Sequence, residues 1–539
     1  MDKILFNARV HTMDEARPTA DAIAISGGKI AAVGSDEEIL RLQTAKTELI
    51  DLKNAAVLPG LSDTHLHLRG LGESFLTVNL NGTRSIGEAL GAIGAFLAAH
   101  PGDGPVRGRG WNQDLWAEGR LPTRHDLDRI QTGRPIVLSR VCGHMSVCNS
   151  RALEFFGILG HGGLPGGEIL LGEDGLPNGL LTETAQSLAN PSVELELGGV
   201  KQRLAAAMAH AASKGLTAAH SDDFPPSLGG AETIMRAYEE LQAEGKMPLR
   251  VFEQAHFRTP EALGAFFAKG YGYDHAKGSL YKVKSLKMLA DGSLGARTAA
   301  LRGEYADAPG QRGTAVYPQK ELDAMVALAH AHGLPVSIHA IGDRAMDMVL
   351  DAVERAQKAF PGLSPRHGII HCQISDEPLL DRFAALRVQA LVQPVFLEYD
   401  AHIVDARVGK TLAATSYNWD GFLKRGVNVS AGSDCPVEPL DPLLNLYCAI
   451  ERKDFEQRPK NGCYSEHCLS PWDAVSLFTV NAARAVGEEG IRGRIKPGML
   501  ADLSVFDVDP FSDEPERLLS GRALMTLLGG KLAFCAEGF

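Results

Sequence analysis

Two histidines separated by one residue stand in the segment DTHLHL, residues 63–68. Alternate side chains of a β-strand point to the same face, so His65 and His67 would share a face with Leu61 and Asp63. Two imidazoles on one face can bind one metal ion, because neutral imidazole nitrogen is a common ligand for zinc-like metals. The alternative is a pair of hydrogen-bonded core histidines among the 18 in the chain. The residues that accompany them decide between the two.

Four further residues able to coordinate metals follow apolar, strand-like runs later in the chain. Lys287 comes late in YKVKSLKMLADG, His339 closes LPVSIH, His371 closes HGIIH and Asp434 closes VNVSAGSD. An unpaired polar group at such a position is costly. Each alone has a structural explanation, as a hydrogen-bonded histidine or as an aspartate before a turn. Their common placement predicts a metal site.

The elements that must position these residues alternate between apolar strand-like runs and helical stretches, which is typical of a parallel sheet. Helices are predicted at KELDAMVALAHAHG, at AMDMVLDAVERAQKAF, and from Ser470 as N-cap and Pro471 as first residue to Gly487. Many strands with helical crossovers favour an α/β fold with a (β/α)8 TIM-like barrel, whose functional side chains lie at the carboxyl ends of strands. The predicted strands are residues 57–68, 105–111, 134–141, 216–223, 281–292, 334–343, 367–373, 388–396 and 427–436.

Both ends of the chain contain short strand-like runs joined by a Gly-Gly turn, in AIAISGGKIAAVGS and in GRALMTLLGGKLAFC. They predict one small β-sandwich domain built from residues 1–57 and 488–539, with two unrelated β tails as the alternative. Residues 58–487 would then form the barrel. An elaborated insertion region is expected over residues 75–215, which contain the glycine- and proline-rich stretch HGGLPGGEILLGEDGLPNG.

Charge and composition narrow the class of partner. A net charge of −12 without a basic cluster argues against a nucleic-acid or anionic-membrane partner, so a small-molecule substrate is expected. No apolar run approaches the roughly 18 residues of a membrane helix, and the first residues lack a secretory-signal pattern. Eight cysteines without a CxxC pair are typical of reduced thiols. These features predict a cytoplasmic protein and leave open whether it is a homo-oligomer.

The order HxH, Lys, His, His, Asp resembles the amidohydrolase superfamily. The strings LPGLSDTHLHL, GRGWNQDLW, KMLADGSLGARTAAL, HAIGDRA and GSDCPVEPLDPL resemble its N-substituted formamide deformylase-like, exoenzyme-type hydrolases, the amidohydrolase 3 type, over nearly the whole chain. The resemblance implies one or two divalent ions. The more buried ion would be held by His65, His67 and Asp434, and the more exposed one by His339 and His371. Lys287 would bridge both as a carbamate.

Lysine can be a metal ligand only after a chemical change, because an ammonium group cannot bind a cation. Lys287 would have to lose its proton and capture CO2. Lys282 and Lys284 are nearby, but in a regular strand they face the other way, and KMLADGS matches the family string at Lys287. If Lys287 pointed outward, a mononuclear site would be favoured. The histidine-rich set with oxygen ligands favours zinc and also admits manganese or iron.

The leading hypothesis is hydrolysis of a non-peptide carbon–nitrogen bond in a small amide, formamide or cyclic amide. Divalent metal can activate water and polarise a carbonyl, and Asp434 would carry a proton from the water to the leaving nitrogen. The alternatives are ester, lactone or phosphoester hydrolysis on the same site, and a non-catalytic dihydropyrimidinase-like scaffold, against which the intact ligand set argues. Three residues are predicted to line the substrate pocket, each with packing as the alternative: Trp111, His144 and His220.

Overall fold

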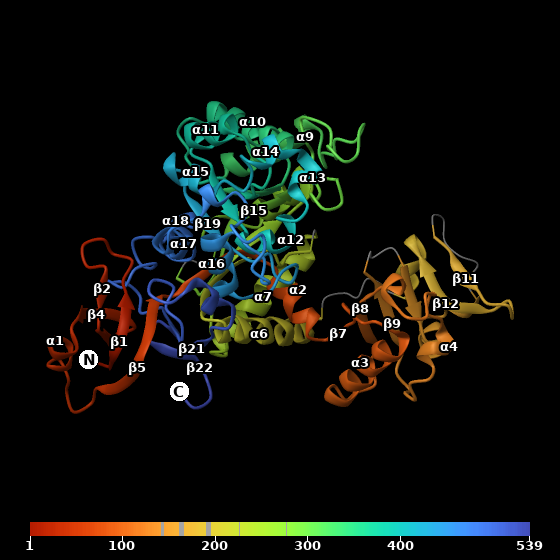
Figure 1. The fold of residues 1–539 in the computed structure, drawn as a ribbon, viewed down its shortest axis with the longest axis horizontal. Coiled ribbons are helices and arrows are strands. Elements are labelled where there is room, and N and C mark those ends of the chain that lie inside the picture. Colours follow the sequence, from red (N-terminus) through yellow and green to blue (C-terminus); the bar gives the residue numbers. More distant parts are fainter. Residues whose placement is uncertain (142–144, 161–166, 190–195, 226, 276–277) are drawn as a thin grey trace. The chain divides into compact units, whose positions relative to one another are not determined.

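The structure is a computed structural model that describes residues 1–141, 145–160, 167–189, 196–225, 227–275 and 278–539. The chain forms two compact units (Figure 1). The first consists of Met1–Arg69 and Leu197–Phe539, and the second is Gly70–Glu196.

Eight parallel strands form a barrel in the first unit, each paired with the next along the chain. They are β6 (Leu61–Leu66), β13 (Leu216–Ser221), β14 (Arg250–His256), β15 (Tyr281–Leu289), β16 (Val336–Ala340), β17 (Gly368–His371), β18 (Gln389–Val392) and β19 (Val429–Ala431).

The barrel closes where the segment after β19 meets the end of β6. The backbone N–H of Asp434 donates to the carbonyl of His65 at 2.8 Å, and the N–H of His67 donates to the carbonyl of Cys435 at 2.8 Å. Gly432 permits this approach, because a Cβ built there would lie 2.5 Å from the backbone nitrogen of His65. Closure therefore brings the first predicted ligand segment beside the last.

Two predicted barrel strands belong elsewhere, and one barrel strand escaped prediction. Segments 105–111 and 134–141 form β8 (Val106–Trp111) and β9 (Ile136–Arg140), which pair in the sheet of the second unit. Their place in the barrel is taken by β14, whose run RVFEQAH contains Glu253 and Gln254. Both side chains are buried, Gln254 toward His65 inside the barrel and Glu253 on the opposite face toward Tyr281. These two polar residues interrupted the apolar pattern by which strands are recognised.

Helices lie between the barrel strands along the chain, and α9, α10 and α11 lie together outside the sheet (Figure 1). The longest amphipathic one, α10, buries Met346, Val349 and Val353 at spacings of three and four. The helices of this unit are α6 (Leu197–Ser213), α7 (Leu228–Ala243), α8 (Pro260–Ala268), α9 (Gln319–Ala331), α10 (Asp343–Ala359), α11 (Glu377–Leu386), α12 (Leu397–Asp400), α13 (Val404–Val408), α14 (Lys410–Ala413), α15 (Trp419–Lys424), α16 (Pro442–Glu451), α17 (Pro471–Phe478) and α18 (Val480–Ala485), with α1 (Asp36–Leu40) near the N-terminus; α2 (Leu68–Ser74) crosses the boundary between the units.

The predicted helix after Ser470 begins as expected but is divided. The Ser470 hydroxyl accepts from the N–H of Asp473, and Pro471 is the first helical residue. Thr479, at φ −121° and ψ −91°, leaves the helical region and separates α17 from α18. The prediction of one continuous helix was wrong at this residue, whose backbone conformation its neighbours in sequence do not reveal.

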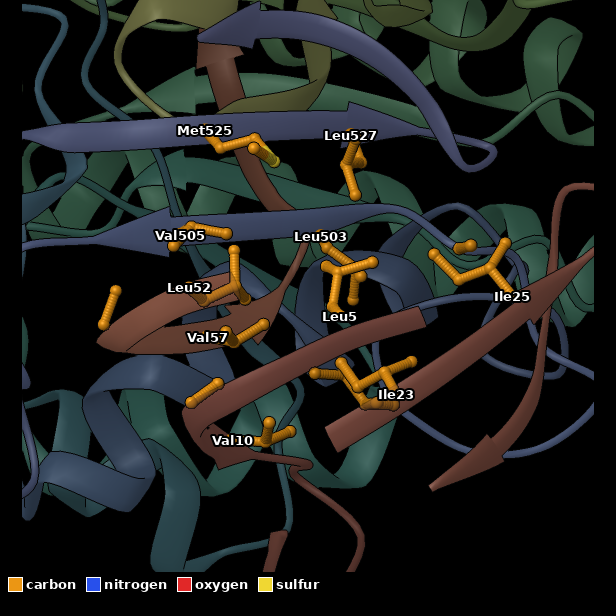
Figure 2. Close-up of a cluster of buried hydrophobic side chains, with 14 of the residues drawn as sticks. Leu5, Val10, Ile23, Ile25, Leu52, Val57, Leu503, Val505, Met525 and Leu527 are labelled. Carbon is orange, nitrogen blue, oxygen red and sulfur yellow. The ribbon is translucent and has the colours of Figure 1, made fainter. Parts of the chain in front are cut away.

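Strands from both chain ends form one sheet in the first unit, in the order β22-β21-β20-β5-β1-β3-β4, with β2 beside β1. Side chains from distant strands of this order, such as Ile23 and Leu527, belong to one buried cluster with Leu5, Val57 and Leu503 (Figure 2). The sheet therefore curls over its own core. Its strands are β1 (Lys3–His11), β2 (Thr19–Ala20), β3 (Ala22–Ser26), β4 (Lys29–Gly34), β5 (Glu48–Pro59), β20 (Leu503–Phe506), β21 (Ala523–Leu528) and β22 (Lys531–Cys535).

The second unit has its own sheet, in the order β11-β12-β10-β9-β8-β7, and its own hydrophobic core. Its remaining elements are β7 (Thr77–Asn79), α3 (Ile86–Ala99), α4 (Arg124–Leu127), β10 (Met145–Cys148), α5 (Ser150–Phe155), β11 (Ile169–Leu171) and β12 (Pro177–Thr182). Within the described ranges of the whole chain, no helix has the length and apolar character needed to cross a membrane.

Candidate metal centre

Three of the predicted ligands converge at the carboxyl ends of their strands. His65, His371 and Asp434 are buried, and each offers a ligand atom within 4.8 Å of those of the other two. The Nε2 atoms of His65 and His67 each lie 3.2 Å from Oδ1 of Asp434. The fold thus gathers nitrogen ligands from two strands around one carboxylate.

The backbone at two of these positions adopts a conformation that non-glycine residues rarely use. His371 has φ 81° and Asp434 has φ 58°. Such conformations cost of order 1–3 kcal/mol each and persist where the surroundings hold them. The hydrogen bond from the N–H of Asp434 to the carbonyl of His65 is one interaction that holds Asp434 in this conformation.

The tautomer of His65 follows from a buried glutamine on β14. Nε2 of Gln254 donates to the carbonyl of Thr64 at 3.1 Å, so Oε1 of Gln254 faces Nδ1 of His65 at 2.7 Å. An amide oxygen only accepts, and Nδ1 of His65 therefore carries the proton. This leaves the Nε2 lone pair directed at the other ligands, as in metal sites where a neighbouring acceptor orients the histidine.

His371 and His67 are held in the same way. Nδ1 of His371 lies 2.7 Å from Oε1 of Gln393, and Nδ1 of His67 lies 3.1 Å from the backbone carbonyl of Asp222. Both partners accept, so both histidines present Nε2 as the free ligand atom. The roles of Gln254, Gln393 and Asp222 could not be predicted from the sequence, because glutamines and a backbone carbonyl have no distinctive spacing.

This arrangement fits a bound cation. If the Nε2 atoms of His65 and His67 carry no proton, their lone pairs face the carboxylate oxygen Oδ1 of Asp434, and that contact is repulsive. A proton or a metal ion between the atoms would make the contact favourable. Burial lowers the pKa of His65 to about 4 and holds the pKa of His371 well below its usual value. Protons are thus disfavoured on His65 and His371, whereas at His67 the carboxylates of Asp434 and Asp222 outweigh burial and raise the pKa. A nitrogen-rich set with one carboxylate suits a zinc-like ion.

Burial by itself would raise the pKa of Asp434, but its close contacts with the imidazole groups of His65 and His67 outweigh burial and hold that pKa well below the usual range. The carboxyl group is therefore an anion at neutral pH. Its Oδ1 makes the contacts to both histidines, and among the described residues no hydrogen bond is made by its Oδ2. One oxygen is positioned to bind metal, and the other is left for a reacting group.

Lys287 points at this centre. Its Nζ lies 2.9 Å from Nε2 of His65, only 2% of the residue is exposed, and burial lowers its pKa. No ion pair is formed by Lys287 in the part of the chain that the structure describes. Lys282 and Lys284, in contrast, pair with Glu488 and Asp274.

His339 lies beside His371, with ring centroids 4.5 Å apart. Its Nε2 donates to the carbonyl of Gly292 at 3.0 Å, so Nδ1 is the atom left to coordinate. Asp291 and Arg297, which lie close together in ADGSLGARTA, do not pair with each other within the described residues. Asp291 accepts backbone N–H groups, including that of Ile341 at 3.0 Å, whereas Arg297 pairs with Asp307.

The three predicted pocket residues have different outcomes. Trp111 is fully buried in the core of the second unit, where its indole N–H donates to the carbonyl of Leu138 at 2.9 Å, the environment of a packing residue. His220 is buried at the end of β13 against Phe252, at a centroid distance of 5.2 Å, and its Nε2 finds no partner among the described residues. His144 lies outside the described residues.

A cavity of about 200 Å³ adjoins the centre. Phe396, which lines it, stacks on His371 with centroids 5.6 Å apart. Its walls come from the segments that follow β15, β16, β17, β18 and β19: Ser293, Leu294, Gly295, Ile341, Gln373, Phe396, Tyr399, Asp400, Val437 and Glu438. The cavity and the ligand set thus lie at the same end of the barrel, at the carboxyl ends of its strands, as is usual for active sites in barrels of this type.

Comparison with known proteins agrees with this architecture. The sequence profile of the Amidohydrolase family matches residues 48–534. YtcJ of Bacillus subtilis (strain 168) is 33% identical over 99% of each chain, and the N-substituted formamide deformylase of Arthrobacter pascens is 26% identical over 100% of this chain and 99% of its own. The crystal structure of an uncharacterized metal-dependent hydrolase from Pyrococcus horikoshii OT3 superimposes with a TM-score of 0.77 at 29% identity, covering 95% of this chain and 99% of that one. The chain belongs to the amidohydrolase family.

Proposed function

We propose that the protein is a metal-dependent hydrolase that cleaves a non-peptide carbon–nitrogen bond of a small amide, formamide or cyclic amide. The observation that carries the proposal is the position of Asp434. Its Oδ1 is shared by two histidines at 3.2 Å, while its Oδ2 is free of hydrogen bonds from the described residues. An amide nitrogen is a poor leaving group without a proton, and a carboxylate held in this way can supply one.

Zinc is the ion that the donor set suits best, in one or two copies. His65, His67 and Asp434 would hold the first ion, and His339 with His371 the second. When bound, such ions lower the pKa of water and polarise the substrate carbonyl. The remaining chemistry is assigned to the chain itself.

Lys287 would join the two sets as a carbamate. Burial favours its neutral amine, and a neutral amine adds CO2 to give a carbamate with release of one proton. The carbamate has a negative charge and two oxygen atoms that can bind metal, whereas the neutral amine has no charge and no oxygen. The contact of 2.9 Å with His65 supports this role for Lys287 over Lys282 or Lys284.

Asp434 would act twice in one turnover. Through Oδ2 it takes a proton from the attacking water, and it then returns that proton to the nitrogen as the C–N bond breaks, giving a carboxylic acid and an amine. Because its pKa is held low, Asp434 is ready as a base at neutral pH and becomes a strong acid once protonated. Such proton transfer typically contributes about 10²- to 10⁴-fold.

The named activity of one relative supports a formamide or similar amide as the substrate. We further propose that the protein works in the cytoplasm on a small molecule, without nucleic-acid or membrane partners. The acidic net charge of −12 supports this choice of partner.

A matched pair of compounds tests the bond type. We expect zinc-loaded protein to hydrolyse N-benzylformamide or another amide in a panel of acylamino acids and cyclic ureas, and to do so in preference to esters and lactones. The ester benzyl formate is the control, and chelation should abolish activity reversibly. Hydrolysis of esters and lactones alone would refute the proposed bond type, and full activity after exhaustive chelation would refute the role of metal.

A further inference from the structure

The charged side chains that line the cavity beside the metal centre are all carboxylates among the described residues. The ten residues of the cavity wall include two carboxylates, Asp400 and Glu438, and no lysine, arginine or histidine. Asp400 is buried and Glu438 is half-buried. Burial raises the pKa of Asp400 to about 6 and, together with the charge of Glu398 and other nearby carboxylates, that of Glu438 to about 7. Each carboxylate is therefore short of compensating positive charge.

A third acceptor on this wall has no partner. Gln373 lines the cavity and is only 3% exposed. Its Nε2 lies 2.6 Å from Oδ2 of Asp400 and 2.9 Å from the hydroxyl of Tyr417, and because a carboxylate only accepts, the atom beside it is the amide nitrogen. Its Oε1 is buried without a partner among the described residues. A buried acceptor left in this state costs free energy, and a positive charge in the cavity would reduce that cost.

Arg407, the basic residue whose charge acts on Asp400, already forms an ion pair with another carboxylate, that of Asp307. The other lining side chains are mainly apolar, and Val437 and Tyr399 are 64% and 55% exposed at the cavity. Such a site suits an apolar body that carries hydrogen-bond donors.

We propose that this cavity binds a substrate with a cationic nitrogen group, an ammonium or amidinium, whose N–H donors are accepted by Glu438 and Asp400 beside the unpaired amide oxygen of Gln373. The cation supplies the charge and donors that the wall lacks, and the aromatic faces of Phe396 and Tyr399 are suited to its body. The inference rests on the proposed function, since it names the class of amide that the metal centre would receive.

Equilibrium binding tests the inference without turnover. Benzamidine, a cation, is titrated into the zinc-loaded protein by calorimetry beside benzamide, its neutral counterpart of nearly equal shape. We expect benzamidine to bind at least tenfold more tightly, with an affinity that falls as salt is added. Glu438→Gln should weaken benzamidine about ten- to hundredfold, as loss of a charge-assisted hydrogen bond does, and leave benzamide unchanged.

Glu398→Gln is the matched control, because this nearby carboxylate does not line the cavity. Equal affinity for the two probes, no binding of benzamidine, or an equal loss in Glu398→Gln would each overturn the inference. The outcome is separable from that of the proposed function. Tight binding of benzamidine through Glu438 in a protein that hydrolyses only esters would uphold the cavity and refute the bond type. Amide hydrolysis by a protein that does not bind benzamidine would uphold the bond type and refute the inference about the cavity.

Discussion

Substitution of Gln254 by methionine tests whether a side chain that never touches the metal sets the metal affinity. Methionine is unbranched and similar in size but neither donates nor accepts. Two buried groups lose their partner, the Nδ1–H of His65 and the carbonyl of Thr64, which Gln254 binds at 2.7 and 3.1 Å. Each orphaned group costs about 1–3 kcal/mol of folding stability.

The effect on metal has a separate cause. Without Gln254, the proton of His65 can move to Nε2, where it blocks the ligand atom and donates to Asp434, 3.2 Å away. Loss of such orienting partners typically weakens metal binding about 10- to 100-fold, or about 1.4–2.8 kcal/mol. Competition with a chromophoric zinc chelator measures the affinity, and thermal unfolding of the metal-free protein measures the stability.

Gln389→Met is the control. Gln389 is a buried glutamine at the amino end of β18, where it donates to the carbonyl of Arg366 at 2.9 Å and accepts from Asn428 at 2.8 Å. We expect it to lose comparable stability and to keep its zinc affinity. Wild-type zinc affinity in Gln254→Met, or the same loss of affinity in both variants, would refute the account of the tautomer.

Three further predictions follow from side chains of the barrel. Lys287→Ala should lose activity and part of its metal, with partial restoration by added short-chain carboxylates. Lys282→Ala, which leaves Glu488 paired with Arg492, should stay active. An inactive Lys282→Ala with an active Lys287→Ala would contradict the assignment. Asp434→Asn keeps a coordinating oxygen but loses the proton acceptor, so kcat should fall about 10²- to 10⁴-fold while metal analysis finds most of the metal retained; near-normal kcat would leave Asp434 a ligand only. Burial lowers the pKa of His367 from 6.5 to about 3, so below pH 6.5 the unfolded chain takes up a proton that the folded protein refuses. The stability should then fall by up to about 1.4 kcal/mol per pH unit between pH 6.5 and 3, and denaturant titrations should show a shallower pH slope in His367→Gln.

The ligand segments were predictable because they couple an apolar strand to a polar residue at its carboxyl end, a pattern that burial enforces. Strand alternation also selected Lys287 among three nearby lysines, and the structure directs that side chain at His65. The same reasoning failed for β14, where Gln254 faces His65 inside the barrel and Glu253 is buried on the opposite face, so that two polar residues break the apolar run. Local pattern cannot distinguish a polar residue that faces a buried partner from one that faces water.

The location of a strand is harder to predict than its existence. Segments 105–111 and 134–141 are strands, yet they pair with each other in the second unit, because pairing depends on contacts between residues distant in sequence. Trp111 has the sequence context of a pocket residue and the surroundings of a core residue. The partners that orient the histidines, Gln254 and Gln393, are equally hidden, since only the assembled barrel brings them to His65 and His371.

The junction between β6 and the segment after β19 makes completion of the barrel the most non-local event in its folding. Asp63 accepts hydrogen bonds from the N–H and hydroxyl of Ser433, at 3.0 and 2.6 Å and a sequence separation of 370. Long-range pairings of this kind form slowly, since the chain loses loop entropy before the contacts repay it. His65 and Asp434 lie on opposite sides of the junction, so a metal ion bound to both would cross-link the first and last strands of the barrel. Amide hydrogens at this junction should exchange with solvent faster than those of β16 and β17 in the metal-free protein, and zinc should slow them selectively.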